Sequence, residues 1–369
     1  MENQPGKLGI REYSAIAIFM TSSKLTDDTV ALIYNQLQNA SWMLPLVSGG
    51  IFFVPLFLLL KTLTLYKNKN LFTVVQQILG KYIGFIVCLL IFVISSTALS
   101  FDSRAYVNII RSFYFTTTPT IILYAILMSV CAYGARKGIQ HIGSVSWLLF
   151  FYSIGAIILA LVLCLKDSIL QSIFPIWGSG KLEILKQSSL KTSIFADFFL
   201  FTLLIPYLTS MKDFRKGTWI SYAFSMILIS GAFMIYIVLF DTSVAGLGYP
   251  FHTAIRFISI GTFLSNVETL FFPIWLTATF IRFSAFLYLC ALMFGHLLKI
   301  KDFEFLIPSL ATVYLLIGII PDTPFDVSLV IRSKIVNVAG LLFASISMIV
   351  WLTAWLKGEF KHEKNKNSM

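Results

Sequence analysis

Ionisable side chains interrupt several stretches of this chain that are otherwise apolar. In chain order they are Lys24, Asp27, Asp28, Asp102, Arg104, Asp197 and Arg282. A charged side chain at the centre of a membrane helix costs at least about 2.5 kcal/mol, and such residues face other helices or a cavity, where they pair or bind. We therefore take these side chains as the first candidates for function.

The first apolar stretch is divided by a polar run: YSAIAIFM is followed by TSSKLTDD and then by TVALIYNQL. Neither apolar piece can span a bilayer alone. Two interpretations stay open, a short helix followed by an exterior loop, or one discontinuous helix whose unwound middle lines a cavity. In the second, Thr26 caps a new half-helix, and Ser22, Ser23 and Lys24 lie at the break. Exposed amides and carbonyls there could hold the carboxylate and ammonium of an amino-acid-like ligand.

The sixth apolar stretch carries Asp197 and Pro206. Proline removes a backbone donor and clashes with the preceding turn, so it bends or breaks a helix. We expect a second discontinuity here, with Asp197 and Phe201 at the ligand site and Pro206 in a structural or coupling role.

The third apolar stretch carries a polar stripe. Ser96, Ser100, Arg104, Asn108 and Arg111 recur at spacings of four, four, four and three residues, which places them on one helical face. Two interpretations are equally open. The stripe holds helices together through Ser and Asn, or it lines a cavity, with the two serines at the ligand and Arg104 in a structural or coupling role.

The eighth stretch places Thr277, Ser284 and Tyr288 on one face, and Arg282 well inside the span. The tyrosine could stack on a small ligand or pack between helices. Arg282 needs an acidic or carbonyl partner, and both Asp197 and a carbonyl of a broken helix remain open. We expect Ser284 and Tyr288 to bind ligand and Arg282 to have a structural or coupling role.

Enzyme motifs are absent from the sequence: it has no phosphate-binding loop, no H-E-x-x-H and no G-x-S-x-G. The four cysteines lie in apolar stretches without a C-x-x-C pair, and the four histidines lack metal-ligand spacing. We therefore expect no enzyme activity, no cofactor and no bound metal.

The composition requires a lipid environment for these elements. Of 369 residues, 57% are hydrophobic and only 12% are charged, against about 25% charged in soluble domains. The net charge of +11 comes mostly from short loops, so we expect no nucleic-acid partner. Ten segments are apolar enough for spanning helices: 10–38, 43–65, 81–113, 119–135, 142–166, 191–211, 217–241, 265–298, 303–320 and 331–356.

The two interruptions fall in segments one and six of ten, the same place in two halves of five. This pattern is typical of inverted-repeat transporters. We expect an all-α integral membrane domain over 1–356, with repeats at about 10–166 and 191–356, and a polar cytoplasmic tail at 357–369. The loops on the same side of the membrane as the two termini contain more Lys and Arg than the loops on the opposite side. Both termini are therefore predicted to be cytoplasmic.

Several stretches of the chain resemble one known family. They are RAYVNIIRSFYFTTTP, YGARKGIQHIG, FADFFLFTLLIPYLTSMKDFRKG and NVETLFFPIWLTATFIRFSAFLYLCALMFGHLLKIKDFEFLIP. In this order they are similar to the endospore germination permease family, the B subunits of nutrient germinant receptors. The resemblance runs over nearly the whole chain.

The resemblance implies a fold and a function. The family belongs to the amino acid–polyamine–organocation (APC) superfamily, which implies a five-plus-five inverted repeat of the LeuT type with discontinuous helices 1 and 6. It implies a ligand pocket among segments one, three, six and eight. It also implies a nutrient sensor in the spore inner membrane that works with a membrane-embedded A subunit and a lipoprotein C subunit.

The family's functional positions can be followed along this sequence. Arg104 matches the arginine of the segment-three motif, and Asp197 stands where the family usually has glutamate. Arg282 stands where lysine is frequent, and Ser284 and Tyr288 match the residues that follow.

The first break departs from the family pattern. Ser23 aligns with a small residue, typically glycine, but Lys24 replaces a small or apolar neighbour. The lysine could favour an anionic ligand group, or it could pair with Asp28 one turn on.

Three functions remain open on the sequence. The first is a ligand sensor of a germinant receptor, which binds a small nutrient such as an amino acid. The second is a proton- or sodium-coupled amino acid transporter, which the same fold would serve. The third is a structural or ion-conducting subunit with a vestigial pocket, in which Lys24 and the run LLIPYL fill the old site.

Overall fold

The computed structural model describes residues 7–66, 69–258, 267–324 and 326–360, and their regular structure is helical apart from one isolated β-bridge between Leu8 and Leu208. The α-helices are α1 Ile10–Ser22, α2 Thr29–Leu37, α3 Met43–Leu65, α4 Leu71–Leu79, α5 Lys81–Phe113, α6 Thr120–Arg136, α7 Ile139–Cys164, α8 Lys181–Leu190, α9 Asp197–Leu200, α10 Met211–Phe240, α11 Pro250–Phe257, α12 Val267–Leu298, α13 Ile307–Ile319 and α14 Ser333–Leu356. A π-helical turn, Asp326–Arg332, precedes α14.

Helical structure occupies the described part of each predicted segment. Within the described ranges, six helical stretches are long and apolar enough to cross a membrane. A seventh is formed if α8 and the helical turns Thr192–Tyr207, which bend by 49° at their junction, count as one span. Helix α6 and the stretch Phe303–Ile319 are apolar but shorter. The prediction of ten crossings therefore stays a prediction, whereas the order and position of the helices follow the sequence pattern.

The first segment is discontinuous inside the bundle. Helix α1 ends at Ser22, a 3₁₀ turn follows at Ser23–Leu25, and α2 begins at Thr29. All residues from 21 to 28 are buried, which rules out the exterior-loop interpretation. The break is stabilised by local side-chain bonds, because Thr26 Oγ1 donates to the carbonyl of Ser23 at 2.7 Å and Asp27 Oδ1 accepts from the amide of Thr29 at 2.8 Å. The N-cap residue of the second half-helix is therefore Asp28 rather than Thr26, and the side chain of Asp27 binds its first amide.

The sixth segment is broken as well. It consists of a 3₁₀ turn at Thr192–Phe195, the single α-turn α9 and a second 3₁₀ turn at Phe201–Tyr207 that contains Pro206. Short 3₁₀ runs have poorer hydrogen-bond geometry than an α-helix. A straight α-helix through 194–208 is absent, as the sequence predicts.

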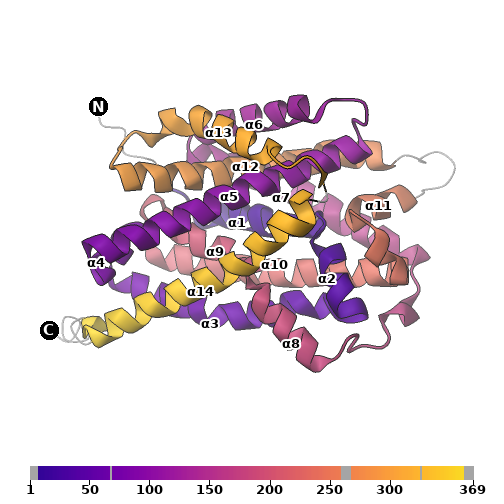
Figure 1. The fold of residues 1–369 in the computed structure, drawn as a ribbon, viewed down its shortest axis with the longest axis horizontal. Helices are drawn as coiled ribbons and strands as arrows, with labels where there is room; N and C mark the ends of the chain where they lie inside the picture. The colour runs from indigo at the N-terminus through magenta and orange to yellow at the C-terminus, as the bar shows by residue number, and fades with distance from the viewer. Residues whose placement is uncertain (1–6, 67–68, 259–266, 325, 361–369) are drawn as a thin grey trace.

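Helix α12 lies in the interior of the bundle, and 83% of its most apolar window is buried. Helices α5, α6, α7 and α1 pack against it. Helix α14 runs diagonally between α5 and α3 (Figure 1) and packs on both, and also on the first turn of segment six. The closest approach is at Gly340, where a Cβ atom would lie 2.5 Å from the amide nitrogen of Ser193. This packing places α14 beside the second break.

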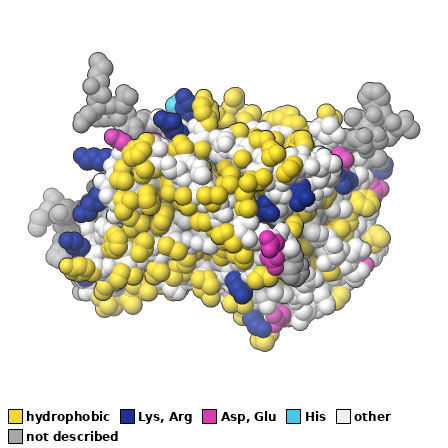
Figure 2. Space-filling model, turned by 45° about the horizontal axis from the view of Figure 1, so that its top comes forward, with side chains coloured by type: hydrophobic (Ala, Val, Ile, Leu, Met, Phe, Trp, Pro, Cys, Tyr) yellow, Lys and Arg dark blue, Asp and Glu magenta, His cyan; other side chains and the backbone are white. Residues whose placement is uncertain are grey.

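The outer surface is largely apolar. Figure 2 shows hydrophobic side chains across the middle of one face and a group of Lys and Arg at its left end. Large apolar side chains are exposed on several helices, among them Ile83, Ile122, Leu148, Phe151 and Leu352. Such a band is typical of lipid contact. The chain is a multi-pass membrane protein.

Candidate functional site: a cavity between two broken helices

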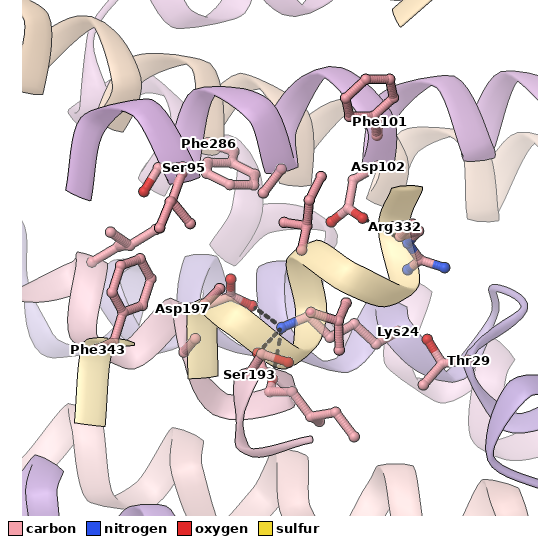
Figure 3. A pocket seen from close by; sticks show the side chains of 18 residues that line it. Lys24, Thr29, Ser95, Phe101, Asp102, Ser193, Asp197, Phe286, Arg332 and Phe343 are labelled. Carbon is pink, nitrogen blue, oxygen red and sulfur yellow. Dashed lines mark hydrogen bonds and ion pairs between the residues drawn. The ribbon is translucent and has the colours of Figure 1, made fainter. Parts of the chain in front are cut away.

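A small cavity lies where the two breaks meet α5 and α14 (Figure 3). Its volume is about 70 Å³, which is room for a few water molecules or one small organic molecule. Polar side chains occupy one part of the lining and apolar ones the rest. They include Lys24, Asp102, Ser193, Asp197 and Arg332 on the polar part, and Ile94, Phe101, Leu200, Phe286, Ile335 and Phe343 on the apolar part.

Lys24 links the two breaks. Its Nζ donates to Asp197 Oδ2 at 2.6 Å, to the carbonyl of Ile194 at 2.6 Å and to that of Ser193 at 3.4 Å. The side chains of Lys24 and Asp197 are each about 10% exposed. Both were predicted as site residues, but the expected alternative partner Asp28 is not the one that Lys24 contacts. The half-helices of segments one and six are therefore joined by a buried ion pair.

Arg282 on α12 ties the first break to α5. Its guanidinium donates to Asp102 Oδ2 at 2.8 Å, to Ser23 Oγ at 2.6 Å and to Tyr106 Oη at 3.1 Å. Tyr106 Oη in turn donates to the carbonyl of Ser23 at 2.8 Å. The acidic partner is thus Asp102, and neither Asp197 nor a broken-helix carbonyl takes that place.

Arg332 is a member of the site that the sequence interpretation missed. It ends the π-helical turn before α14, its Nε donates to Asp102 Oδ1 at 2.7 Å, and its two terminal nitrogens pair with Asp27 and Asp28. Because it lies at the start of the last predicted span, it was interpreted as one of the loop charges that set the orientation of the chain in the membrane. Two adjacent carboxylates in one apolar segment were the signal for a planar guanidinium partner.

The buried network carries unequal charges. Three cationic side chains face four carboxylates: Lys24, Arg282 and Arg332 against Asp27, Asp28, Asp102 and Asp197. Among the described residues, the second carboxylate oxygen of Asp28 is buried without a hydrogen-bond partner. A buried charge is costly unless it is paired. The network is therefore short of one positive charge, which a proton or a cationic ligand group can supply.

The predicted serines Ser22, Ser23, Ser96 and Ser100 do not line the cavity, and Ser23 accepts from Arg282 as described above. Ser22 Oγ donates to Ser225 Oγ at 3.0 Å, Ser96 Oγ lies 3.0 Å from Tyr314 Oη, and Ser100 Oγ donates to the carbonyl of Ser96 at 3.0 Å. The contact of Ser96 joins α5 to α13, as the first of the two interpretations of the polar stripe requires. The contact of Ser22 joins α1 to α10, and that of Ser100 lies within α5.

Three further predicted residues make packing contacts. Phe201 packs edge-on against Tyr13 with ring centroids 6.0 Å apart, and Tyr288 packs edge-on against Tyr207 at 6.2 Å. Ser284 faces α6 at Gly134, where a Cβ atom would lie 2.8 Å from the serine Oγ. None of the three lines this cavity.

Arg104 and Pro206 also lie away from the cavity. Arg104 is buried and forms no ion pair with any residue that the structure describes. Pro206 is exposed in the second 3₁₀ turn of segment six. Their structural or coupling roles stay predictions.

A protein-family model described as "Spore germination protein" matches residues 14–327. The chain belongs to this spore germination family. The matched region contains both breaks and Lys24, Asp102, Asp197 and Arg282, and it ends before Arg332 and α14. The family resemblance predicted from the sequence is confirmed.

Two curated relatives of the family come from Bacillus subtilis (strain 168). The chain is 27% identical over 204 residues to spore germination protein KB, which covers 54% of this chain and 55% of the relative. It is 23% identical over 198 residues to spore germination protein B2, covering 54% of each. The match therefore spans about half the length of these relatives.

The fold is similar to that of a solved transporter. A nucleobase-cation-symport-1 family transporter, in a closed conformation with bromovinylhydantoin bound, aligns with a TM-score of 0.62 at 15% identity. The alignment covers 97% of this chain and 82% of the transporter. The predicted all-α, LeuT-type transporter fold is confirmed, whereas the count of ten helices stays a prediction.

Proposed function

We propose that this chain is the nutrient-sensing membrane subunit of a spore germinant receptor. It binds a small molecule, an amino acid, in the cavity between the two broken helices and triggers germination. The observation that carries the proposal is the cavity itself: in a chain of the spore germination family, charged groups of both breaks converge on a space of about 70 Å³.

The lining supports an amino acid with an aliphatic side chain. The polar part offers Asp102, Asp197 and Lys24 to the charged groups of such a ligand, while Phe286 and Phe343 face the same space with apolar rings. Asp102 and Asp197 are the carboxylates of the lining that could accept hydrogen bonds from the ammonium group of the ligand.

Sensing would work by a shift between two helix arrangements. A ligand held by segment one, segment six and α14 together stabilises the arrangement in which these elements approach each other, and its effect equals its difference in affinity for the two states. We propose that the A subunit and the lipoprotein C subunit respond to this shift, in the spore inner membrane, with both termini of the chain cytoplasmic.

The test combines binding with germination. The purified protein is heated with each of the twenty amino acids in turn, and one or a few should raise its melting temperature. Ala339→Phe, on the cavity wall of α14, should abolish that increase, whereas Leu341→Phe, which is 46% exposed on the same helix, should retain it. Spores that carry Ala339→Phe should fail to germinate on the same amino acid. Normal germination of spores without the gene on every nutrient refutes the proposal.

A second candidate is an amino acid transporter coupled to protons or sodium. The observation that favours it is the fold shared with a symport-family transporter over 97% of this chain. Liposomes that contain the protein distinguish the two functions, since concentrative uptake of the bound amino acid indicates transport and binding without flux indicates sensing.

A further inference from the structure

The ammonium of Lys24 lies in a ring of oxygen atoms from the second break. Two main-chain carbonyls and one carboxylate oxygen surround it, those of Ser193, Ile194 and Asp197. Figure 3 shows the Lys24 nitrogen converging with these groups beside the cavity. A simple ion pair requires the carboxylate alone. The two carbonyls make this a coordination site for a cation.

Oxygen ligands of this kind are those that hard metal cations take in proteins. In transporters with discontinuous helices, unwound carbonyls at the breaks hold the coupling cation. Here the cation that these oxygen atoms surround is the ammonium of Lys24, which is covalently attached to the first break. Lysine is suited to the position because its ammonium is a compact point charge on a flexible stem.

We propose that Lys24 is a tethered substitute for a monovalent cation, and that its removal exposes a Na⁺ or K⁺ site formed by Ser193, Ile194 and Asp197. In the native chain, the two breaks are therefore held together without an ion from solution. If the cavity binds a nutrient as proposed above, that binding is independent of Na⁺ and K⁺. The cation site itself does not depend on the nutrient.

The negative charge around this position favours the binding of a cation once Lys24 is removed. The native network already has one carboxylate in excess, and without Lys24 the buried Asp197 loses its only ion-pair partner among the described residues. The carboxylate of Asp197 then faces the cavity without a counter-charge, beside the carbonyls of Ser193 and Ile194. A small monovalent cation restores the balance better than water does.

The experiment measures thermal unfolding of the full-length protein in detergent, in NaCl, KCl or N-methyl-D-glucamine chloride at equal ionic strength. The melting temperature of the native protein should be the same in all three salts. That of Lys24→Ala should rise with the logarithm of the Na⁺ or K⁺ concentration and not with the organic cation. At 100 times the dissociation constant, the folding equilibrium constant increases about a hundredfold.

Two matched variants identify the site. Lys24→Met fills the same volume without a charge and should show no cation response. Lys24→Ala combined with Asp197→Asn removes the carboxylate ligand and should also lose the response. Equal behaviour of a folded Lys24→Ala variant in all three salts overturns the proposal.

The native protein provides an independent test in case Lys24→Ala does not fold. A melting temperature of the native protein that depends on Na⁺ or K⁺, and that loses this dependence in Asp197→Asn, also overturns the proposal, because it places a cation at oxygen atoms that Lys24 already occupies. Neither measurement uses a nutrient. A failure here therefore leaves the proposed receptor function standing, and a failure to bind amino acids leaves this proposal standing.

Discussion

Replacement of Arg332 by glutamine should strongly destabilise the protein. The guanidinium contacts three carboxylates, those of Asp27, Asp28 and Asp102, and its side chain is 5% exposed. Removing one partner of a buried ion pair costs about 3–5 kcal/mol, because the remaining charge stays buried. A change of 1 kcal/mol moves the melting temperature by about 2–4 °C in a chain of 150–250 residues and less in a longer one. We therefore expect a decrease of roughly 5–10 °C.

The same reasoning predicts a rescue. Arg332→Gln raises the excess of carboxylates in the network from one to two. Adding Asp27→Asn and Asp28→Asn leaves Lys24 and Arg282 against two carboxylates, so that the network is neutral. The triple variant should recover most of the lost stability, since replacing an entire buried ion pair is often neutral or stabilising.

The assay is thermal unfolding of the purified variants in one detergent. Lys334→Gln is the control, because this lysine is exposed two residues along the same chain segment and forms no ion pair with the described residues; it should change stability by about 0.5 kcal/mol at most. The charge argument is refuted if Arg332→Gln melts like the native protein, or if the triple variant is no more stable than Arg332→Gln alone.

Three further substitutions test other parts of the structure. Gly340→Ala should separate α14 from the first turn of segment six, because its Cβ would lie 2.5 Å from backbone there. We expect the free energy of unfolding to fall by about 1–3 kcal/mol. Gly155→Ala, which faces open space, should be tolerated, and the unfolding midpoints of the two variants are compared. Tyr106→Phe removes a hydroxyl that donates to the first break and accepts from the buried arginine of α12. The free energy of unfolding should fall by about 1–2 kcal/mol in the same assay, and an unchanged midpoint contradicts this role. Glu268→Gln breaks a half-exposed pair with Arg256 and should cost about 1 kcal/mol or less, which a larger shift would contradict.

The breaks could be predicted from the sequence because their cause is local. A run of Ser, Thr and Asp inside an apolar stretch offers the backbone hydrogen bonds other than those of a helix, and Thr26 and Asp27 make such bonds. Proline in segment six acts in the same local way. The position and order of the helices follow similarly from apolar length.

The pairing of charges could not be predicted, because it depends on which elements approach each other. Lys24 and Asp197 lie 173 residues apart, and the sequence offers Asp28 as a nearer partner. The polar faces of segments three and eight pose a related problem. A serine or tyrosine on such a face can line a cavity or contact a neighbouring helical segment. Ser96 and Tyr288 contact neighbouring segments.

The contacts of Arg332 have a consequence for biosynthesis. Asp27 and Asp28 precede their guanidinium partner by 305 and 304 residues, so the ribosome makes the partner long after the two carboxylates. Until then, the first segment of the nascent chain holds two acidic groups without the guanidinium that pairs with them. A polypeptide that stops before Arg332 leaves both carboxylates without this partner. Compensation of the charges in the first break thus requires synthesis of the segment that carries Arg332.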